Sequence, residues 1–564
     1  MAALGLAVGA APRGAGQTAL PEPRVDAELR FDVEPRFDAE SRFDVEPRVD
    51  AKLRAGPHPV GFRSSWELDW GRTYATAFDG GATYGGGGRS PRPILINLWY
   101  PARAASGEPM PYGHYLEIGS DDPELDRYGR ALADHARDVL VGEVFDASEA
   151  ELDELDAALL RELLAAPTAC RRDAEPAAGP FPLVVYHSGA GSSFEDNALL
   201  CEHLASHGYA VLGSAFPRAA GDSFEVDARD GSAADLAFLV RHARGLEFVD
   251  WGRVALAGHS LGAQAVLRAG ARPGCVADAL VLLDTTQDYY TLAVPGYGSL
   301  IEETTANAEW LGEPMLVAAG PAAMFRLCDR FDRSERTYVT FPELDHNEFV
   351  SQGLQRLAVL ERRAARDPGA TPSAAADRAA PVRREYAALG ELVRLFLDAH
   401  LRGAPAPLAA RLEPLRATAL GGPDLHAESA PRGQAGPEPY DEASDRPPSP
   451  RQLGPLLAER GAAATVAVLE RFRDREPRSP VYTSSMLMGS VLYELVEADR
   501  REEARALHAF AVELNPNVLG ALVFLADVQV LLGRPEAALP LLQAALSLDP
   551  ELERAAERLR ELRE

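Results

Sequence analysis

Ser260 lies in the run Gly258-His-Ser-Leu-Gly262, which has the pattern G-x-S-x-G. An apolar stretch typical of a buried strand, 254–257, precedes it, and a helix-like stretch, 263–268, follows. A serine on so tight a strand-to-helix turn has a strained backbone, and the residues two before and two after it must be small. Such a turn presents a hydroxyl for attack on a carbonyl carbon. The pattern also arises by chance in long chains, so the flanking strand and helix give it its weight.

A serine hydroxyl needs a base, and a histidine base needs a carboxylate that orients it. Two histidines, His346 and His400, follow Ser260 within the region of strands. His346 comes just after the last apolar strand, where the base of such a site belongs. His400 lies in an amphipathic helix expected at 386–401, so we expect it to be structural.

Asp284 is the favoured carboxylate, because it ends the strand that follows the Ser260 unit, and strand-end loops carry functional groups in such sheets. Asp329 and Asp332 come after the next strand, in a charged helix-like stretch typical of a solvated face. Asp345 directly precedes the candidate base, and adjacent side chains rarely point at each other. The sequence therefore predicts Ser260 as nucleophile, with Asp284 ahead of these alternatives as the acid.

The negative oxygen that forms during acyl transfer needs two backbone N–H donors. One is expected from Leu261, which follows the nucleophile. The other is expected from Gly189 in the loop 187–191, whose small residues let the backbone approach a substrate. Ser188 of this loop is an expected substrate contact, and His187, which has no cluster of metal ligands around it, is expected to have a structural role.

These groups need a framework of alternating strands and helices. Apolar runs predict strands at 93–101, 182–186, 209–213, 254–257, 279–283, 314–319 and 337–341, and amphipathic runs predict helices at 147–165, 198–207, 233–245 and 386–401. Continuous apolar strands separated by helices indicate a mostly parallel sheet that is covered on both faces.

The chain divides by composition. Residues 1–59 contain an imperfect six-residue repeat, 24–53, and are expected to be a disordered tail. Residues 60–402 are expected to form the catalytic domain, in which the long acidic stretch 103–180 could form a helical cap. Residues 403–450 are rich in Pro and Gly and are expected to be a linker.

The C-terminal region, 451–564, is expected to be an all-α domain of helical repeats. A period of 34 residues relates two sets of positions: Ala504, Ala511, Leu514 and Pro516 recur as Ala538, Ala545, Leu548 and Pro550. This spacing is similar to a tetratricopeptide repeat. Two repeats rarely stand alone, so we expect them to pack on a further helix or on the catalytic domain, and to be able to bind a protein partner.

Composition excludes some classes of protein. Fifty-seven Lys and Arg face 85 Asp and Glu, a net charge of -28, which argues against a nucleic-acid partner. The 4 cysteines have neither metal-binding nor disulfide-framework spacing, so no metal and no cofactor are expected. No run approaches a membrane span, so a soluble protein is expected. The apolar start, 1–11, is an incomplete secretory signal and leaves both a cytoplasmic and an exported protein open.

Four segments together resemble a known family: Trp99-Tyr-Pro-Ala102, the loop 187–191, the run 258–262 and an acid that ends the next strand. They are similar to the platelet-activating-factor acetylhydrolase group, which borders the dienelactone-hydrolase-like esterases. Over about residues 60–402 the resemblance implies an α/β-hydrolase fold, metal-free cleavage of a carboxylic ester and a role in lipid degradation. It also implies a catalytic triad of Ser260, Asp284 and His346. Ser188 departs from the glycine that is common in the family.

Other functions remain open on sequence alone. The same fold serves lipases, thioesterases, acyltransferases and peptidases, because fold does not fix the substrate. An inert hydrolase domain that carries a partner-binding repeat domain is a further alternative. The nucleophile, acid and base occur in the order that an active enzyme requires, which favours hydrolysis of a small-molecule or lipid ester with a short-chain or phospholipid-type acyl group.

Overall fold

The computed structural model describes residues 53–73, 91–103, 108–216, 226–289, 302, 304–366, 374–418, 420, 424–531 and 534–563. The expected tail, with its six-residue repeat, lies outside the described residues as far as residue 52.

The described residues form one sheet of ten strands, in the order β10-β9-β8-β7-β6-β4-β5-β2-β1-β3. The run from β5 to β9 is parallel. The pairs β5–β2, β2–β1 and β9–β10 are antiparallel, and β3 pairs parallel with β1. The strands are β1 Val60–Thr73, β2 Pro91–Pro101, β3 Cys170–Arg172, β4 Phe181–His187, β5 Ala210–Gly213, β6 Val249–His259, β7 Ala279–Leu283, β8 Met315–Ala319, β9 Arg336–Thr340 and β10 His426–Ala430.

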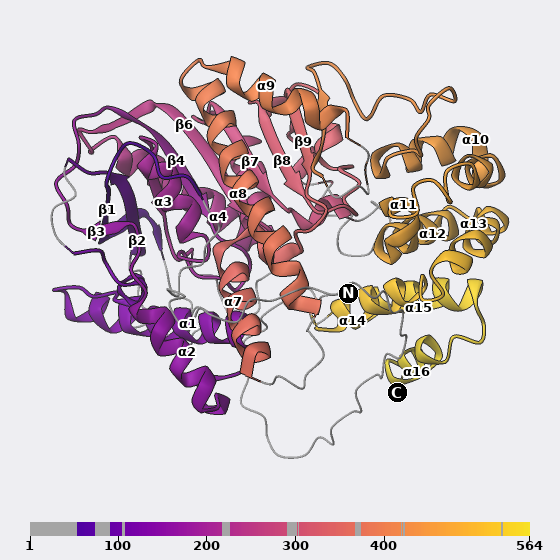
Figure 1. Ribbon diagram of the computed structural model, residues 1–564, viewed down its shortest axis with the longest axis horizontal. Coiled ribbons are helices and arrows are strands. Elements are labelled where there is room, and N and C mark those ends of the chain that lie inside the picture. The colour runs from indigo at the N-terminus through magenta and orange to yellow at the C-terminus, as the bar shows by residue number, and fades with distance from the viewer. Residues whose placement is uncertain are drawn as a thin grey trace, which may run out of the picture.

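Helices cover both faces of this sheet (Figure 1). One apolar core joins the sheet to α4 and α5, and another joins its opposite face to α3, α7 and α8. Every residue of β4, β5, β7, β8 and β9 is buried, which explains the apolar runs of β4, β5, β7 and β8, whereas β9 also buries Arg336, Thr337 and Thr340. The helices of this region are α1 Pro123–Phe145, α2 Glu154–Ala165, α3 Ala198–Ser206, α4 Val226–Ala243, α5 Leu261–Gly270, α7 Ser351–Arg366, α8 Ala374–Leu401 and α9 Pro405–Arg416.

This topology confirms the predicted α/β-hydrolase fold with a helical C-terminal region. The predicted parallel strands occur within a few residues of their expected bounds, but sequence analysis missed β1, which pairs along its length with β2. The helix expected at 147–165 is broken: a 3-10 turn, Glu149–Glu151, is followed by α2 after Asp153, whose side chain caps that helix.

The stretch 103–180 contains two helices that pack beneath the sheet region, at the lower left of Figure 1. Asp122 begins α1 by accepting hydrogen bonds from the N–H groups of Glu124 and Leu125. The inserted helices are held against α7 by ion pairs. Arg363 contacts both carboxylate oxygens of Asp156, at 2.9 and 2.7 Å, and the carbonyl oxygen of Phe145 at 3.0 Å.

The stretch 403–450 differs from the linker that composition predicts. It contains α9 and the strand β10, which extends the sheet by pairing with β9. The prolines are compatible with this structure because Pro405 stands in the first turn of α9, where its missing N–H costs no hydrogen bond. The sheet therefore includes residues beyond 402.

The C-terminal helices form antiparallel neighbours with their own apolar core, at the right of Figure 1. The recurring alanines Ala504, Ala511, Ala538 and Ala545 are buried at matching positions of α13 and α15. The helices are α10 Pro450–Glu470, α11 Pro480–Thr483, α12 Ser485–Glu497, α13 Arg501–Leu514, α14 Gly520–Leu531, α15 Pro535–Leu548 and α16 Glu553–Glu561.

Arg451 connects this helical domain to the sheet domain. It is 3 % exposed and forms ion pairs with Asp329, in the 3-10 turn Cys328–Arg330 between β8 and β9, and with Glu428 of β10. Asp329 is therefore buried, and its expected place on a solvated face is wrong, whereas Asp332 is exposed. A charge pattern alone does not reveal that a distant arginine covers one carboxylate of the pair.

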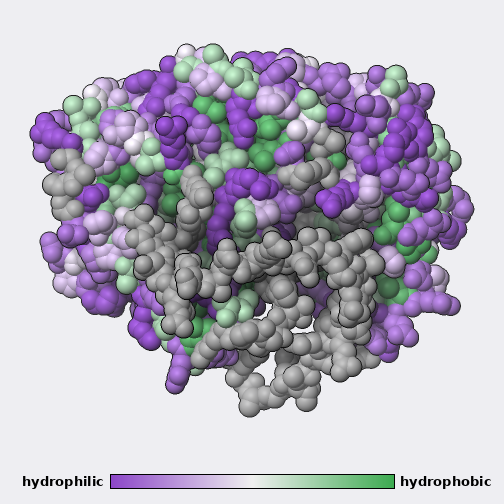
Figure 2. All heavy atoms as spheres, viewed as in Figure 1, coloured by the Kyte–Doolittle hydropathy of each residue, from purple (hydrophilic) through white to green (hydrophobic). Residues whose placement is uncertain are grey.

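Hydrophilic side chains dominate the rim of the face in Figure 2, with smaller hydrophobic areas between them. Among the described helices, none combines the length and the apolar character that a bilayer crossing requires.

Candidate active site

Ser260 occupies a strained position between β6 and α5. Its φ of 55° and ψ of −117° lie outside the regions that residues with side chains normally adopt. The Ser260 N–H donates to the carbonyl oxygen of Leu283 at 2.9 Å, which fixes the turn against β7.

The two flanking glycines are required by close backbone contacts. A Cβ on Gly258 would lie 2.4 Å from the carbonyl carbon of Gly262, and a Cβ on Gly262 would lie 2.2 Å from the carbonyl oxygen of His187. This confirms the prediction that both positions must be small.

Ser260, His346 and Asp284 form a hydrogen-bonded chain. The Nε2 atom of His346 lies 3.0 Å from Ser260 Oγ, and its Nδ1 atom lies 2.6 Å from Asp284 Oδ2. Asp284 follows β7, and His346 begins the 3-10 turn His346–Phe349 after β9. Because the carboxyl ends of parallel strands meet at one edge of the sheet, residues far apart in sequence lie side by side.

The geometry assigns complementary roles to the two ring nitrogens of His346. If Nδ1 carries the proton and donates to the carboxylate, Nε2 is left to accept a hydrogen bond from Ser260 Oγ. A hydroxyl held in this way can be deprotonated as it attacks a carbonyl carbon, and the buried carboxylate stabilises the imidazolium that forms. Ser260 is 8 % exposed and Asp284 2 % exposed, so little water competes for these bonds.

Three groups form hydrogen bonds with the carboxylate of Asp284. Burial alone would raise the pKa of its carboxyl, but the hydrogen bond and charge of His346, the Tyr289 hydroxyl and the Gly320 N–H together lower it. The Gly320 N–H lies 2.9 Å from Asp284 Oδ1, and the Tyr289 hydroxyl donates to the same oxygen. Asp284 is therefore held as a carboxylate. Sequence analysis did not identify Tyr289.

His259, the residue before Ser260, supports the loop of His346. Its Nε2 lies 2.9 Å from the backbone carbonyl oxygen of His346. Burial, followed by the charge of His346, lowers the pKa of His259 to about 3, so it stays neutral near pH 7. The position inside G-x-S-x-G is a weak signal for this role.

The loop 187–191 packs directly against Ser260. A Cβ on Gly189 would lie 3.5 Å from Ser260 Cβ and 3.1 Å from His259 Nδ1. The N–H of Gly189, an expected oxyanion donor, contacts Asp196 Oδ2 at 3.3 Å. Leu261, the other expected donor, is the first residue of α5, where a backbone N–H has no acceptor within the helix.

Two carboxyl groups lie buried behind this loop. Burial raises the pKa of Glu195 and of Asp196 to about 7. Asp196 accepts a hydrogen bond from the Tyr186 hydroxyl at 2.9 Å, and Glu195 accepts one from Ser193. Both carboxyls are therefore partly protonated near pH 7 and carry less charge than their exposed counterparts.

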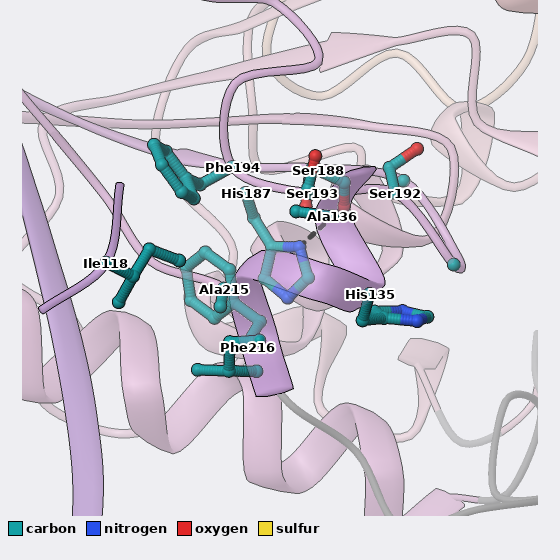
Figure 3. A pocket seen from close by; sticks show the side chains of 13 residues that line it. Ile118, His135, Ala136, His187, Ser188, Ser192, Ser193, Phe194, Ala215 and Phe216 are labelled. Atoms are coloured by element: carbon teal, nitrogen blue, oxygen red, sulfur yellow. Dashed lines mark hydrogen bonds between the residues drawn. The ribbon is translucent and has the colours of Figure 1, made fainter. Parts of the chain in front are cut away.

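A cavity of about 540 Å³, part of it open to solvent, adjoins the loop 187–191. Its apolar wall includes Phe194, Phe216 and two residues of α1, Leu132 and Ala136. Figure 3 shows the His187 ring at the centre of the lining, with a dashed bond to Ser188. This ring stacks on Phe216, with 3.7 Å between ring centroids. Ser188 and Gly189 also line the cavity, and Gly189 packs against Ser260, which is not itself one of the lining residues.

The inserted helix α1 also reaches the loop of His346. Glu143 Oε2 accepts a hydrogen bond from the Asn347 side chain at 3.0 Å. Burial raises the pKa of Glu143, while the charges of Arg356 and His346 act in the opposite direction. No sequence motif marks this contact, because it depends on how the insertion folds back.

The remaining candidates lie apart from the hydrogen-bonded chain. Asp345 caps the turn that begins at His346 and pairs with Arg378 at 2.9 Å. His400 packs on Phe396 within α8, with 4.5 Å between ring centroids. Among the described residues, no group of three or more His, Cys, Asp or Glu side chains is arranged to hold a metal ion.

Comparison with known proteins gives a structural likeness but no family. No family model matches the chain, and no curated protein matches it. Among solved structures, the chain is similar to a ferulic acid esterase from Streptomyces cinnamoneus. The two are 20% identical, and the match covers 63% of this chain and 94% of the esterase, with a TM-score of 0.41.

Proposed function

We propose that this protein is a serine hydrolase that cleaves carboxylic esters through an acyl-enzyme. Ser260 attacks the ester carbonyl while His346 takes its proton, and Asp284 orients and stabilises the imidazolium. His346 returns the proton to the departing alcohol, and water then releases the acid by the reverse sequence. The observation that carries this proposal is the pair of distances, 3.0 and 2.6 Å, that link the three side chains.

The oxyanion is proposed to bind the N–H groups of Leu261 and Gly189. The position of Leu261 at the start of α5 supports the first assignment, because helix N-termini favour negative charge. The Gly189 N–H lies 3.3 Å from Asp196 Oδ2, which is a long hydrogen bond. A negative oxygen beside Ser260 can replace Asp196 as the acceptor of this N–H. Ser188 is proposed as a substrate contact, which its place in the cavity lining supports.

The substrate is proposed to be a small-molecule or lipid ester with a short-chain or phospholipid-type acyl group. The apolar side chains of the cavity support this class, since they favour an acyl chain over a charged group. We also propose that α12–α15 are tetratricopeptide-like repeats that bind a protein partner. The matching positions of the buried alanines in α13 and α15 support this proposal.

The first test is labelling with a fluorophosphonate probe, with the modified peptide located by mass spectrometry. We expect labelling at Ser260 in the wild type and none there in Ser260→Ala. Ser490→Ala is the matched control, because it removes a fully buried serine hydroxyl from the helical domain. A folded wild type that does not react, or a Ser260→Ala variant that still hydrolyses esters, would refute the proposal.

A series of p-nitrophenyl esters of increasing acyl length then defines the substrate class. We expect turnover that depends on Ser260 and falls for chains that exceed the cavity. Added acceptor alcohols distinguish hydrolysis from acyl transfer: a product ester in place of the free acid would identify an acyltransferase.

A further inference from the structure

Tyr289 lies where the candidate acid, the sheet domain and the helical domain meet. It ends the 3-10 turn Thr286–Tyr289 that follows Asp284. Its hydroxyl donates to Asp284 Oδ1 and accepts a hydrogen bond from the Gly320 N–H at 2.8 Å. Its ring packs against both the core beneath α4 and α5 and the core of the helical domain. One side chain thus separates the helical core from the carboxylate of Asp284.

A second connection runs through the backbone beside Tyr289. The carbonyl oxygen of Asp288 accepts a hydrogen bond from the N–H of Met324 at 2.7 Å. The Met324 side chain is fully buried in the core of the helical domain. Two residues on, Arg326 pairs with Glu494 of α12 at 2.6 Å. The helical domain therefore contacts both the turn that follows Asp284 and the loop that follows β8.

We propose that Tyr289 is a positioning residue for the acid Asp284, and that packing of the C-terminal helical domain keeps Tyr289 in place. The inference rests on the proposed function, in which Asp284 orients the base. The hydroxyl bond to Oδ1, together with the Gly320 N–H on the same oxygen, leaves Oδ2 facing His346 and fixes the rotation of the carboxylate. Burial, followed by the charge of Asp284, raises the pKa of Tyr289 well above its ordinary range, which keeps the hydroxyl a donor.

Other titratable groups lie around His346 and Tyr289. His259 bonds the His346 carbonyl through Nε2, Glu143 bonds the neighbouring Asn347, and Asp345 and Glu348 belong to the turn that His346 begins. Asp288 lies beside Tyr289 in the same 3-10 turn, and burial raises its pKa to about 6. A change in titration is therefore assigned from the resonance of the proton between His346 and Asp284, which these other carboxyls do not share.

Tyr289→Phe tests the positioning role because it keeps the ring and removes the donor. Without that bond the Asp284 carboxylate turns more freely, so kcat should fall about tenfold with KM nearly unchanged. The carboxylate also holds more negative charge toward His346, so the low-pH limb of kcat/KM should move up by about half a unit. Tyr482→Phe is the matched control: it removes a tyrosine hydroxyl bond, 2.8 Å to the Leu469 carbonyl, within the helical core, and should move neither quantity.

Met324→Ala tests the contribution of the helical domain. The cavity beside Tyr289 should cause a smaller change in the same direction, about threefold in kcat. Leu541→Ala opens a cavity in α15 of the same core and should lower the melting temperature without moving the pH limb. Equal pH profiles for Met324→Ala and Leu541→Ala would overturn the role of the helical domain.

A spectroscopic readout separates this inference from the proposed function. The proton shared by His346 Nδ1 and Asp284 Oδ2 should give a low-field NMR signal that titrates with pH, whether or not the protein hydrolyses an ester. A shifted titration in folded Tyr289→Phe supports positioning even if esterase activity is absent. An unshifted titration and an unchanged kcat in that variant would overturn the inference, even if Ser260 is fully reactive.

Discussion

The imidazole ring of His259 lies 4.7 Å from the ring of His346, and its Nε2 contacts the His346 backbone carbonyl oxygen at 2.9 Å. The residue before the nucleophile thus holds the loop that carries the proposed base. Because His259 is neutral near pH 7, its Nε2–H can donate to the carbonyl without adding positive charge beside the base.

His259→Phe should lower kcat/KM about tenfold, since it removes one buried hydrogen bond and loosens the loop of His346. His259→Gln retains an amide donor and should restore part of the rate. Steady-state kinetics on a short-chain ester, with melting temperatures of both variants, would check this. Equal rates for wild type and folded His259→Phe would show that the bond does not position the base.

Gly189→Ala should reduce kcat about tenfold or more while the protein stays folded. The added methyl group would meet His259 Nδ1 at 3.1 Å, so the loop or the His259 ring must shift by a few tenths of an ångström, which displaces either the Gly189 N–H or the bond from His259 to the His346 loop. Gly142→Ala is the matched control, because a Cβ there meets nothing within 4 Å and an alanine favours the helix. If both variants hydrolyse esters at the wild-type rate, this loop does not supply an oxyanion donor.

Arg363→Met should raise KM and destabilise the protein by about 2 kcal/mol, because it leaves the largely buried Asp156 without its partner and loosens α2 against α7. The adjacent Arg362→Met breaks an exposed pair with Glu162 and should cost at most about 0.5 kcal/mol. Thermal unfolding and ester kinetics of the two variants provide the comparison. The same KM in both would indicate that the inserted helices do not shape the substrate site.

Glu195→Gln should change how stability depends on pH. Burial raises the pKa of Glu195 from 4.5 to about 7 in the folded state, so the folded protein binds this proton more tightly than the unfolded chain. The stabilisation is complete below about pH 4.5 and is lost as pH rises through 7. The variant lacks that loss, so its melting temperature relative to wild type should rise from pH 4.5 to pH 8, by the equivalent of about 3 kcal/mol.

Glu413→Gln provides the control for this titration, because that carboxyl side chain is 81% exposed. Its difference from wild type should be flat over the same pH range. A flat difference for Glu195→Gln as well would mean that this carboxyl stays ionised in the folded protein.

Local patterns predicted the parts of the structure that local rules control. Buried parallel strands are continuous apolar runs, and the turn at Ser260 needs glycines two residues away on each side, so both could be found in the sequence. Leu261 could be identified because it follows the nucleophile, and His346 because it follows the last strand. The triad roles of Ser260, Asp284 and His346 and the oxyanion role of Leu261 stay predictions that the proposed experiments address.

Contacts between distant segments escaped sequence analysis. Asp329 was predicted to lie on a solvated face because its neighbours in sequence are charged. Its burial is favourable because it forms an ion pair with Arg451 of α10, which is distant in sequence. Tyr289 and Glu143 carry no motif, because their contacts depend on how a turn and an insertion fold back. The strand β10 was missed because five small and polar residues in a Pro-rich stretch give little β signal until β9 offers a partner.

The placement of β10 has a consequence for self-association. Each outer strand of an open sheet offers unpaired N–H and C=O groups to which another chain can add. Here β10 has five residues and β3 has three, and Glu428 of β10 is engaged by Arg451. At the β10 margin this leaves little continuous backbone for a second copy to extend. At the other margin β3 pairs only with Val60–Phe62, so beyond Phe62 the 14-residue β1 has no described strand on its outer side and is the place where another chain could add.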